Sequence, residues 1–397
     1  MRKIAATYIF PGNLPPIKNG ILVCEEDGTV IDIIKGEDSF REEHGIEFYS
    51  GILTPGFVNA HCHLELSHLH GKIGEHEGIG GFIKAINQLR NEETQDIERL
   101  LNAIDRKMWA SGIAAVGDIS NSDISIHTKQ KSKIKYHTFV EVFGFHPSRA
   151  TRAFDYAQMV VDEFQANGLA SSVVPHSPYS VSEPLFNKIR KNAETTSRIL
   201  SIHNQESEAE KQFFIDGTGP ISGHLQNNLG IDISHWKPTG ESSLQSTLKH
   251  LPAENQLLLV HNTFTEKSDI YKLRDQRSVD NTFFVLCPNS NLYIENKLPP
   301  VTLFRNENLK ICLGTDSLAS NRQLSILAEM VTLQENFPEI SFEELVSWAC
   351  IIGAEALKIE KDFGSFEPGK KPGVNLITGI DFQTMRLTSA SKVKRLV

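Results

Sequence analysis

Short apolar runs rich in β-branched residues recur through the middle of the chain and alternate with stretches of mixed apolar and polar residues. Strands that are buried on both faces read as such continuous runs, and helices between them make a sheet parallel. The pattern therefore predicts a (β/α)8 TIM-like barrel, and the lack of a G-x-G-x-x-G or P-loop pattern disfavours a doubly wound open sheet. Eight runs can be identified: GILTPGFVNAH, GIAAVGDIS, KYHTFVEVFGF, LASSVVPHS, RILSIHN, NQLLLVHN, NTFFVLCPN and LKICLGTDS.

The two ends of the chain have a different pattern, with short strands separated by turns. Residues 1–52 contain KIAATYIF and GILVCEEDGTVIDIIKG, where Asp27-Gly28 between two β-rich runs indicates a hairpin. Residues 364–397 begin with a segment punctuated by Gly and Pro that leads into the strand-like run Val-Asn-Leu-Ile. We expect residues 1–52 plus 364–397 to form a small β-sandwich domain and residues 53–363 to form the barrel domain.

One connection inside the predicted barrel is unusually long. It runs from Asp216 to Glu241, is rich in Gly and Pro, and has no clear helical period. Loops of this length in compact domains are commonly lids or binding loops. We expect a lid that brings Trp236 to the substrate, and a plain surface excursion stays open as the alternative.

Charge and composition favour a small-molecule partner. The formal net charge is −9, with acidic and basic residues mixed along the chain, which disfavours nucleic acid and anionic membranes as partners. The apolar segment at the N-terminus is short and Pro-interrupted, so we expect no signal peptide and a cytoplasmic protein. Five scattered cysteines without C-x-x-C spacing indicate neither a disulfide framework nor a thiolate zinc site.

The chemistry-bearing residues gather where predicted strands end. A single histidine at a strand end is more often structural than a metal ligand, but barrel enzymes build their sites from the carboxyl ends of several strands. Imidazoles and a carboxylate converging there form the nitrogen and oxygen shell that zinc or iron accepts, with a position open for water. Five ends carry such residues: His61-Cys62-His63, Pro175-His176-Ser177, His203-Asn204-Gln205-Glu206, His261-Asn262-Thr263 and Gly314-Thr315-Asp316-Ser317.

The order His-x-His, His, His-x-x-Glu, His and Asp along these ends resembles the amidohydrolase superfamily, in its cytosine deaminase and chlorohydrolase branch. TPGFVNAHCHLE is similar to the first-strand motif of that branch, PHSPYSVS to its substrate histidine motif, and GSFEPGKKPGVNLI to its closing β-sandwich motif. The last departs from the pattern, because Gly373-Val374-Asn375-Leu376 stands where Ala-Asp-Leu is usual. The runs HCHLELS and CLGTDSLASNRQLSILAEM are most similar to the aminodeoxyfutalosine deaminases.

The resemblance implies one divalent metal, zinc or alternatively iron. It also implies that Glu206 shuttles protons, that His261 steadies the water used in the reaction, and that Asp316 takes a proton from that water. The fourth strand ends in Val174-Pro175-His176 and offers no lysine for a bridging carbamate and a second metal. The implied metal ligands are His61, His63, His203 and Asp316.

Four residues are candidates for substrate contact. His176 matches the substrate histidine of the family, and Ser317 follows the implied ligand Asp316. Glu65 shares the strand parity of His63 and would face the cavity if that strand continues, with a salt bridge on the loop as the alternative. Trp236 is a candidate from the predicted lid.

These residues fit hydrolytic deamination of an aromatic amine better than proteolysis. We expect an adenosine-like nucleoside such as aminodeoxyfutalosine as the substrate, with ammonia as a product. One alternative is an amidohydrolase that opens a cyclic amide or lactam, as the related imidazolonepropionases do. A second alternative is a catalytically silent binding protein on the same fold. A homodimer is left open.

Overall fold

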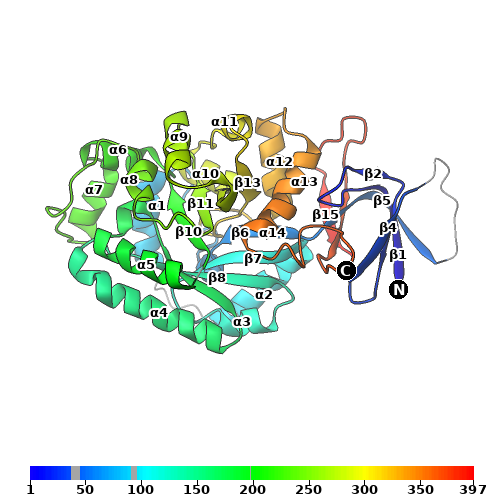
Figure 1. The fold of residues 1–397 in the computed structure, drawn as a ribbon, viewed down its shortest axis with the longest axis horizontal. Helices are drawn as coiled ribbons and strands as arrows, with labels where there is room; N and C mark the ends of the chain where they lie inside the picture. Colours follow the sequence, from blue (N-terminus) through cyan, green and yellow to red (C-terminus); the bar gives the residue numbers. More distant parts are fainter. Residues whose placement is uncertain (37–44, 91–95, 197) are drawn as a thin grey trace.

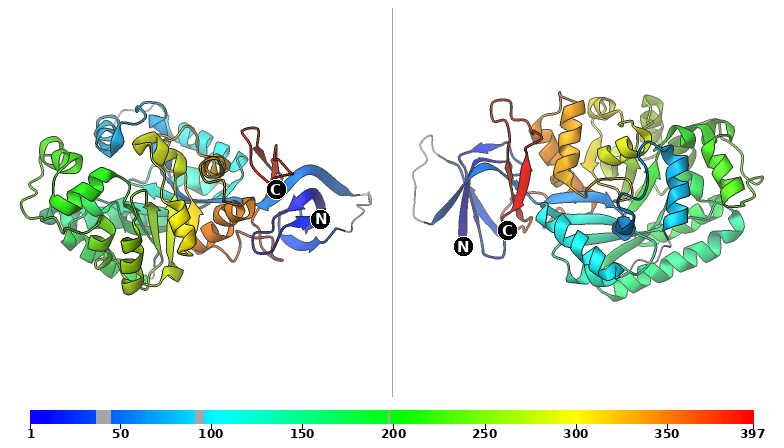
Figure 2. Two further views of the ribbon diagram at one scale, coloured as in Figure 1. Left: turned by 90° about the horizontal axis from the view of Figure 1, so that it is seen from above. Right: turned by 180° about the vertical axis from the view of Figure 1, so that it is seen from behind.

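The computed structural model describes residues 1–36, 45–90, 96–196 and 198–397. Strands from both ends of the chain lie together at one end of the molecule, and the region between them forms the larger α/β part (Figure 1). Figure 2 shows the same separation from above and from behind, with the N- and C-termini close to each other. The chain therefore leaves the terminal sheet once and returns to it.

All eight predicted strands of the α/β part are present. They form two four-stranded parallel sheets, in the orders β6-β7-β8-β9 and β10-β11-β12-β13. The facing edges of the two sheets are linked by backbone bonds, because His203 N donates to His176 O (2.9 Å) and Thr315 N donates to His61 O (2.9 Å). The strands are β6 (Phe57–Cys62), β7 (Ile113–Ser120), β8 (Lys135–Val142), β9 (Ala170–Pro175), β10 (Leu200–Asn204), β11 (Leu257–His261), β12 (Thr282–Leu286) and β13 (Lys310–Leu313).

Helices follow the strands and cover the sheets. Local capping contacts fix where individual helices begin. For example, Ser341 and Glu344 form a reciprocal capping box at the start of α13, which satisfies backbone N–H groups that would otherwise be unpaired. The helices are α1 (Gly78–Leu89), α2 (Ile97–Ala110), α3 (Ile126–Lys131), α4 (Ala150–Ala166), α5 (Glu183–Thr196), α6 (Glu208–Asp216), α7 (Pro220–Gly223), α8 (Ser243–Leu248), α9 (Lys267–Gln276), α10 (Pro288–Glu295), α11 (Val301–Asn306), α12 (Ile326–Asn336), α13 (Phe342–Ala349) and α14 (Ile351–Ala356).

The main hydrophobic core lies on both faces of these strands. Every residue of β7 is buried, as the uninterrupted apolar run predicted. Large side chains such as Phe139, Phe283, Phe284 and Phe304 are fully buried there. Their burial removes apolar surface from water, and it fixes the strand ends that carry the polar residues.

The terminal strands combine into one seven-stranded sheet with the order β15-β14-β5-β1-β3-β4, in which β2 also pairs with β1. The predicted hairpin is confirmed, since β3 and β4 pair antiparallel around Asp27-Gly28. Asn375, in the segment that departs from the family pattern, is buried and donates to Gly112 O (2.8 Å). The strands are β1 (Arg2–Ile9), β2 (Ile17–Lys18), β3 (Ile21–Cys24), β4 (Val30–Ile34), β5 (Ile46–Pro55), β14 (Val374–Thr378) and β15 (Lys392–Arg395).

The long connection from Asp216 to Glu241 is only partly irregular. It contains α7 and then a π-helical turn at His224–Asn228. The prediction of a connection without helix is therefore wrong for residues 220–228, because a single turn is too short to give a readable period of hydrophobic positions.

In the described residues, all five cysteines are free and buried. No described helix has the length and apolar character needed to cross a membrane.

A buried ion pair supports the start of the loop after β6. Lys129 Nζ lies 2.7 Å from Asp118 Oδ2, and both side chains are inaccessible to solvent. Asp118 Oδ1 also accepts a hydrogen bond from Leu64 N (2.8 Å), directly after His63. The Lys129 ammonium additionally donates to Ser120 and Thr138. The pair thus ties α3, β7 and the segment that carries His63 together.

We predict that Lys129→Met lowers the free energy of unfolding by about 3–5 kcal/mol, because it leaves the Asp118 carboxylate buried and unpaired. Urea unfolding measures the change. The double variant Lys129→Met/Asp118→Asn should recover part of the loss, since it removes the charge but keeps an acceptor for Leu64 N. A single variant as stable as the parent would contradict the role of the pair.

Candidate active site

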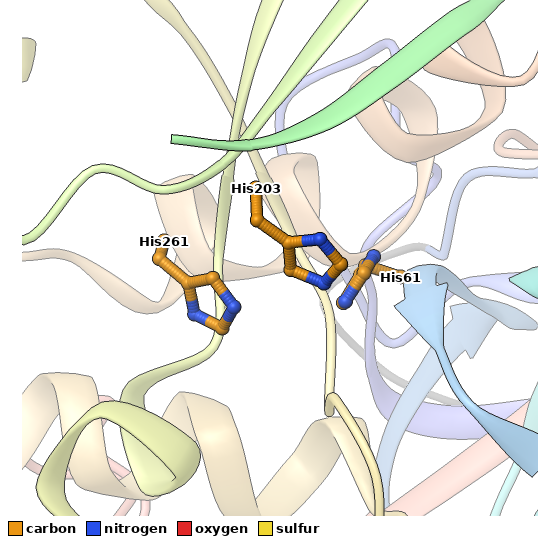
Figure 3. A group of neighbouring side chains, drawn as sticks. All are labelled: His61, His203 and His261. Atoms are coloured by element: carbon orange, nitrogen blue, oxygen red, sulfur yellow. The ribbon is translucent and has the colours of Figure 1, made fainter. Parts of the chain in front are cut away.

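Three histidine side chains converge where β6 and β10 end. His63 Nε2 lies 3.2 Å from His61 Nε2 and 3.2 Å from His203 Nε2. Figure 3 shows the rings of His61 and His203 close together, with His261 beside them. Asp316 completes the cluster, with its Oδ1 atom 3.6 Å from His61 Nε2 and 3.4 Å from His63 Nε2. All of these side chains are buried.

The spacing fits a metal ion. Two nitrogen atoms that each lie about 2.1 Å from one ion are roughly 3.2–3.4 Å apart at near-tetrahedral angles. The cluster also contains sets of three donor atoms that lie within 4.8 Å of one another, among them His61, His63 and Asp316. Nitrogen and carboxylate donors in such a set suit zinc or iron, so the residues present fit the metal that the family resemblance implies.

The protonation states of the histidines favour metal binding. His203 Nδ1 donates to His176 O (2.8 Å), which leaves Nε2 with a free lone pair. Burial, together with the neighbouring His176 and His61, lowers the pKa of His203 to about 4. Burial likewise holds the pKa of His63 well below its ordinary value. Both rings are therefore neutral near pH 7 and present nitrogen lone pairs to the same point.

Two hydroxyl groups orient Asp316. Ser290 Oγ and Ser320 Oγ each donate to Asp316 Oδ2 at 2.6 Å, so that Oδ1 faces the imidazoles. Burial opposes ionisation, but the contacts with His61, His63 and His261 outweigh it and hold the pKa of Asp316 well below its usual range. The carboxylate is thus charged and fixed in orientation. Asp316 also has a left-handed backbone (φ 57°), which an aspartate adopts only where surrounding contacts enforce it.

Glu206 and His261 face each other beside the cluster. Glu206 Oε1 lies 3.5 Å from His261 Nε2, and both residues are buried. Burial raises the pKa of Glu206 well above its ordinary value, and the nearby Asp316 and Glu210 raise it further. Asn291 Nδ2 lies 3.3 Å from His261 Nδ1, an arrangement that leaves Nε2 as the ring nitrogen turned toward Glu206. A carboxyl with a raised pKa is suited to proton transfer.

Glu210 holds the backbone that carries Glu206. Its carboxylate accepts hydrogen bonds from Gln205 N (2.9 Å) and Glu206 N (3.1 Å), and its own N–H donates to Ser207 Oγ. Gln205 has a left-handed backbone (φ 47°), and its side chain donates to Asp269 Oδ2 (2.8 Å). Sequence reasoning missed Glu210, although Ser-x-x-Glu at 207–210 is the pattern of a helix capping box.

A cavity of about 240 Å³ opens above these side chains. His63, His203, Glu206, His261 and Asp316 line one part of it. Helix α1 and the segment after α6 supply much of its apolar wall, through Ile79, Phe82, Ile83, Ile86, Ile221 and Leu225. Polar groups line another part, namely Arg90, Asn121, Glu141, Arg149, His176 and Tyr179. Such a largely apolar cavity with few polar groups is typical of a small-molecule site.

Two of the four candidates for substrate contact line this cavity, and two do not. His176 and Ser317 are in its wall. The condition for Glu65 is not met, because β6 ends at Cys62 and a 3-10 helix follows at Leu64–Leu69, which abolishes strand parity. Glu65 instead accepts a hydrogen bond from Asn121 N (3.0 Å). Trp236 lies outside the cavity wall and stacks on Phe213, with 4.1 Å between ring centroids.

Comparison with known proteins agrees with the fold. The model of the amidohydrolase family matches residues 52–395. An adenosine deaminase of Helicobacter pylori is 25% identical over 338 residues, which is 83% of this chain and 79% of that protein. An aminofutalosine deaminase structure from H. pylori, in complex with methylthio-coformycin, has a TM-score of 0.81 at 20% identity, with each chain fully covered.

A zinc-bound adenosine deaminase structure from Xanthomonas campestris has a TM-score of 0.75 at 18% identity and covers 98% of this chain and 87% of its own. At these identities the two structures show likeness of fold. The family model spans most of the chain and therefore shows membership of the family. The motif order read from the strand ends agrees with it, and the chain belongs to the amidohydrolase family.

Proposed function

We propose that the protein is a metal-dependent hydrolytic deaminase of an adenosine-like nucleoside, such as aminodeoxyfutalosine, and that it releases ammonia. One observation carries the proposal: three buried imidazole nitrogens and the Asp316 carboxylate meet at one point, next to Glu206, in the wall of a cavity. The likeness to an adenosine deaminase and to an aminofutalosine deaminase supports the substrate class.

We assign one divalent metal, preferably zinc, with iron as the alternative. His61, His63, His203 and Asp316 would hold it, because their donor atoms share one point and burial lowers the pKa values of His63 and His203. Bound there, the metal would lower the pKa of a water from 15.7 toward about 7 and so supply a nucleophile. The likeness to a zinc-bound structure supports the choice of metal.

Two carboxyl groups carry the proposed proton transfers, and a histidine stabilises the attacking water. Asp316 accepts the proton of the attacking water, since its carboxylate is charged and its Oδ1 atom is turned to the cluster. His261 steadies that water and the developing negative charge from the other side. Glu206 gives its proton to a ring nitrogen and later passes a proton to the departing amine, for which its raised pKa suits it.

The cavity accommodates a nucleoside better than a bare base. Its volume and its apolar wall extend beyond the cluster, between α1 and the segment after α6. His176 and Ser317 are the proposed contacts near the reacting ring, because both line the cavity close to the implied ligands. Opening of a cyclic amide would use the same residues and is the alternative that the product distinguishes.

We also propose that the chain forms two domains, a barrel and a smaller β domain made by the two chain ends. The backbone bonds between β9 and β10 and between β6 and the end of β13 support one (β/α)8 barrel within residues 53–363. The shared sheet of both chain ends supports a separate domain from residues 1–52 plus 364–397, with a β-sandwich as its proposed form. A homodimer, the lack of nucleic-acid and membrane partners, and a cytoplasmic location stay predictions.

The purified, zinc-loaded protein should release ammonia from at least one member of a panel that contains aminodeoxyfutalosine, adenosine, 5′-methylthioadenosine, guanine and cytosine. Glu206→Gln should lower kcat by roughly 10²–10⁴-fold and leave the metal content unchanged, because the variant cannot donate the proton. Asp316→Asn serves as the blank.

The two alternative functions, opening of a cyclic amide and binding without catalysis, predict different results for this experiment. Acid formation from a cyclic amide without ammonia would replace deamination by ring opening. Binding without turnover, with Glu206→Gln indistinguishable from the parent protein, would indicate a silent binding protein. Either result would overturn the proposed function.

We further predict that Glu210→Gln lowers kcat by roughly 10- to 100-fold with little change in KM or metal content. The amide would set an N–H donor against the backbone N–H of Gln205 or Glu206 and displace the proton shuttle. Glu208→Gln is the matched control, since Glu208 is exposed on the same helix. Steady-state kinetics and elemental analysis measure both variants, and equal kcat values for them would refute the positioning role.

A further inference from the structure

The backbone that carries Asp316 is held in an unfavourable conformation. Asp316 has a φ of 57°, in the left-handed region that costs a residue with a side chain more than the right-handed one. Its N–H donates to His61 O (3.1 Å), and Thr315 N donates to the same oxygen (2.9 Å). A conformation of this kind persists only where the surrounding contacts determine it. The side chains that contact this turn are therefore of interest.

Asn59, on β6, bonds Thr315 with both ends of its amide. Its Oδ1 atom accepts a hydrogen bond from Thr315 N (3.1 Å), and its Nδ2 atom donates to Thr315 Oγ1 (2.8 Å). Both residues are fully buried. The amide has one orientation that suits both bonds, because turning it over would set its NH2 group against the N–H of Thr315. The pair thus joins Thr315 to the strand that carries His61.

Asn321, before α12, bonds the same turn at another atom. Its Nδ2 atom donates to Thr315 O (2.9 Å), and its Oδ1 atom accepts a hydrogen bond from Gln323 N (3.2 Å). The peptide between Thr315 and Asp316 is therefore bonded both at its oxygen, by Asn321, and at its N–H, by His61 O. Rotation of this peptide would change the φ of Asp316, and these bonds oppose it.

The pair of Asn59 and Thr315 lies next to two of the implied metal ligands. Asn59 is two residues before His61, and Thr315 directly precedes Asp316. Ser290 and Ser320 orient the carboxylate of Asp316, but they bond only its side chain. The position of the backbone that carries this carboxylate depends on the turn. The distance of 3.6 Å between Asp316 Oδ1 and His61 Nε2 depends on it as well.

We propose that Asn59 is a positioning residue for the metal site, which holds the backbone of Asp316 through Thr315. This rests on the metal ligands assigned under the proposed function. Asn59 lies outside the cavity wall and touches no substrate there. Without its amide, the turn relaxes toward conformations that cost less, and Asp316 Oδ1 moves away from the point where the imidazole nitrogens meet. Loss of Asn59 therefore weakens metal binding and lowers kcat, with a smaller effect on KM.

The test measures how firmly the zinc-loaded parent and Asn59→Ala proteins hold their metal. Each is equilibrated with a series of chelator concentrations, and elemental analysis measures the zinc that remains. Asn59→Ala should lower zinc affinity by about 10- to 100-fold, the usual effect of removing a group that orients a ligand. Cobalt-loaded samples of both proteins should differ in visible absorption, because that spectrum depends on the geometry of the ligands.

Asn255→Ala is the matched control. Asn255 is also a buried amide with two hydrogen bonds, which its Nδ2 atom donates to Ala193 O and Arg198 O (2.9 Å each). It lies just before β11 begins, whereas the implied metal ligands lie where strands end. Its loss should lower stability, but zinc affinity and the cobalt spectrum should equal those of the parent.

Thr315 provides a second pair of variants. Thr315→Val removes the hydroxyl at nearly constant volume and leaves Asn59 Nδ2 without its acceptor, so it should reproduce the loss of zinc affinity. Thr315→Ser keeps the hydroxyl and should restore most of that affinity. This comparison decides the role of Asn59 even where Asn59→Ala fails to fold.

Three results would overturn the positioning role. They are a zinc affinity and a cobalt spectrum of Asn59→Ala equal to those of the parent, a loss of the same size in Asn255→Ala, and equal affinities in Thr315→Val and Thr315→Ser. A parent protein that retains no zinc would overturn the metal assignment and the role of Asn59 together. Lack of ammonia release by the zinc-loaded parent would overturn the deaminase function alone, because the zinc measurements do not depend on turnover.

Discussion

The convergence of three imidazole nitrogens on one buried point is the interaction on which the site depends. His63 Nε2 lies 3.2 Å from both His61 Nε2 and His203 Nε2, and lone pairs at that spacing repel each other unless a cation lies between them. The protein sets up this arrangement through backbone geometry, because His61 lies near the end of β6 and His203 near the end of β10, which are edge strands of the two parallel sheets. The surrounding hydrogen bonds then select the tautomer of His203 and the orientation of Asp316.

A second layer of buried polar contacts holds the segments that carry the proposed proton-transfer groups and metal ligands. Glu210 holds the backbone of Glu206, and Asp118 holds the segment after His63. These contacts lie among the most buried polar residues of the chain, where their hydrogen bonds are strong and an unpaired partner is costly. The residues proposed to react thus depend on groups outside the proposed metal site and outside the cavity wall. The cavity wall is different, since much of it is apolar and comes from α1 and the segment after α6.

Much of this could be predicted from the sequence. Continuous apolar runs located all eight strands, and the polar residues that follow them located the cluster of His61, His63, His203 and Asp316. The prediction for Glu65 depended on where β6 ends, a boundary that periodicity cannot resolve. Glu141 was missed because a strand buried on both faces gives no alternation to show which side chains face the cavity. Trp236 was misjudged because an irregular segment carries no signal for which neighbours it packs against.

The central claim is that these residues are arranged around one metal ion, and anomalous diffraction from crystals of the zinc-loaded protein tests it most directly. We predict one strong peak about 2.1 Å from the Nε2 atoms of His61, His63 and His203, with Asp316 Oδ1 completing the coordination. Data collected on the two sides of the zinc absorption edge would identify the element. A peak among Glu141, His176 and His203 instead, or no peak at the cluster in protein that elemental analysis shows to contain zinc, would contradict the account.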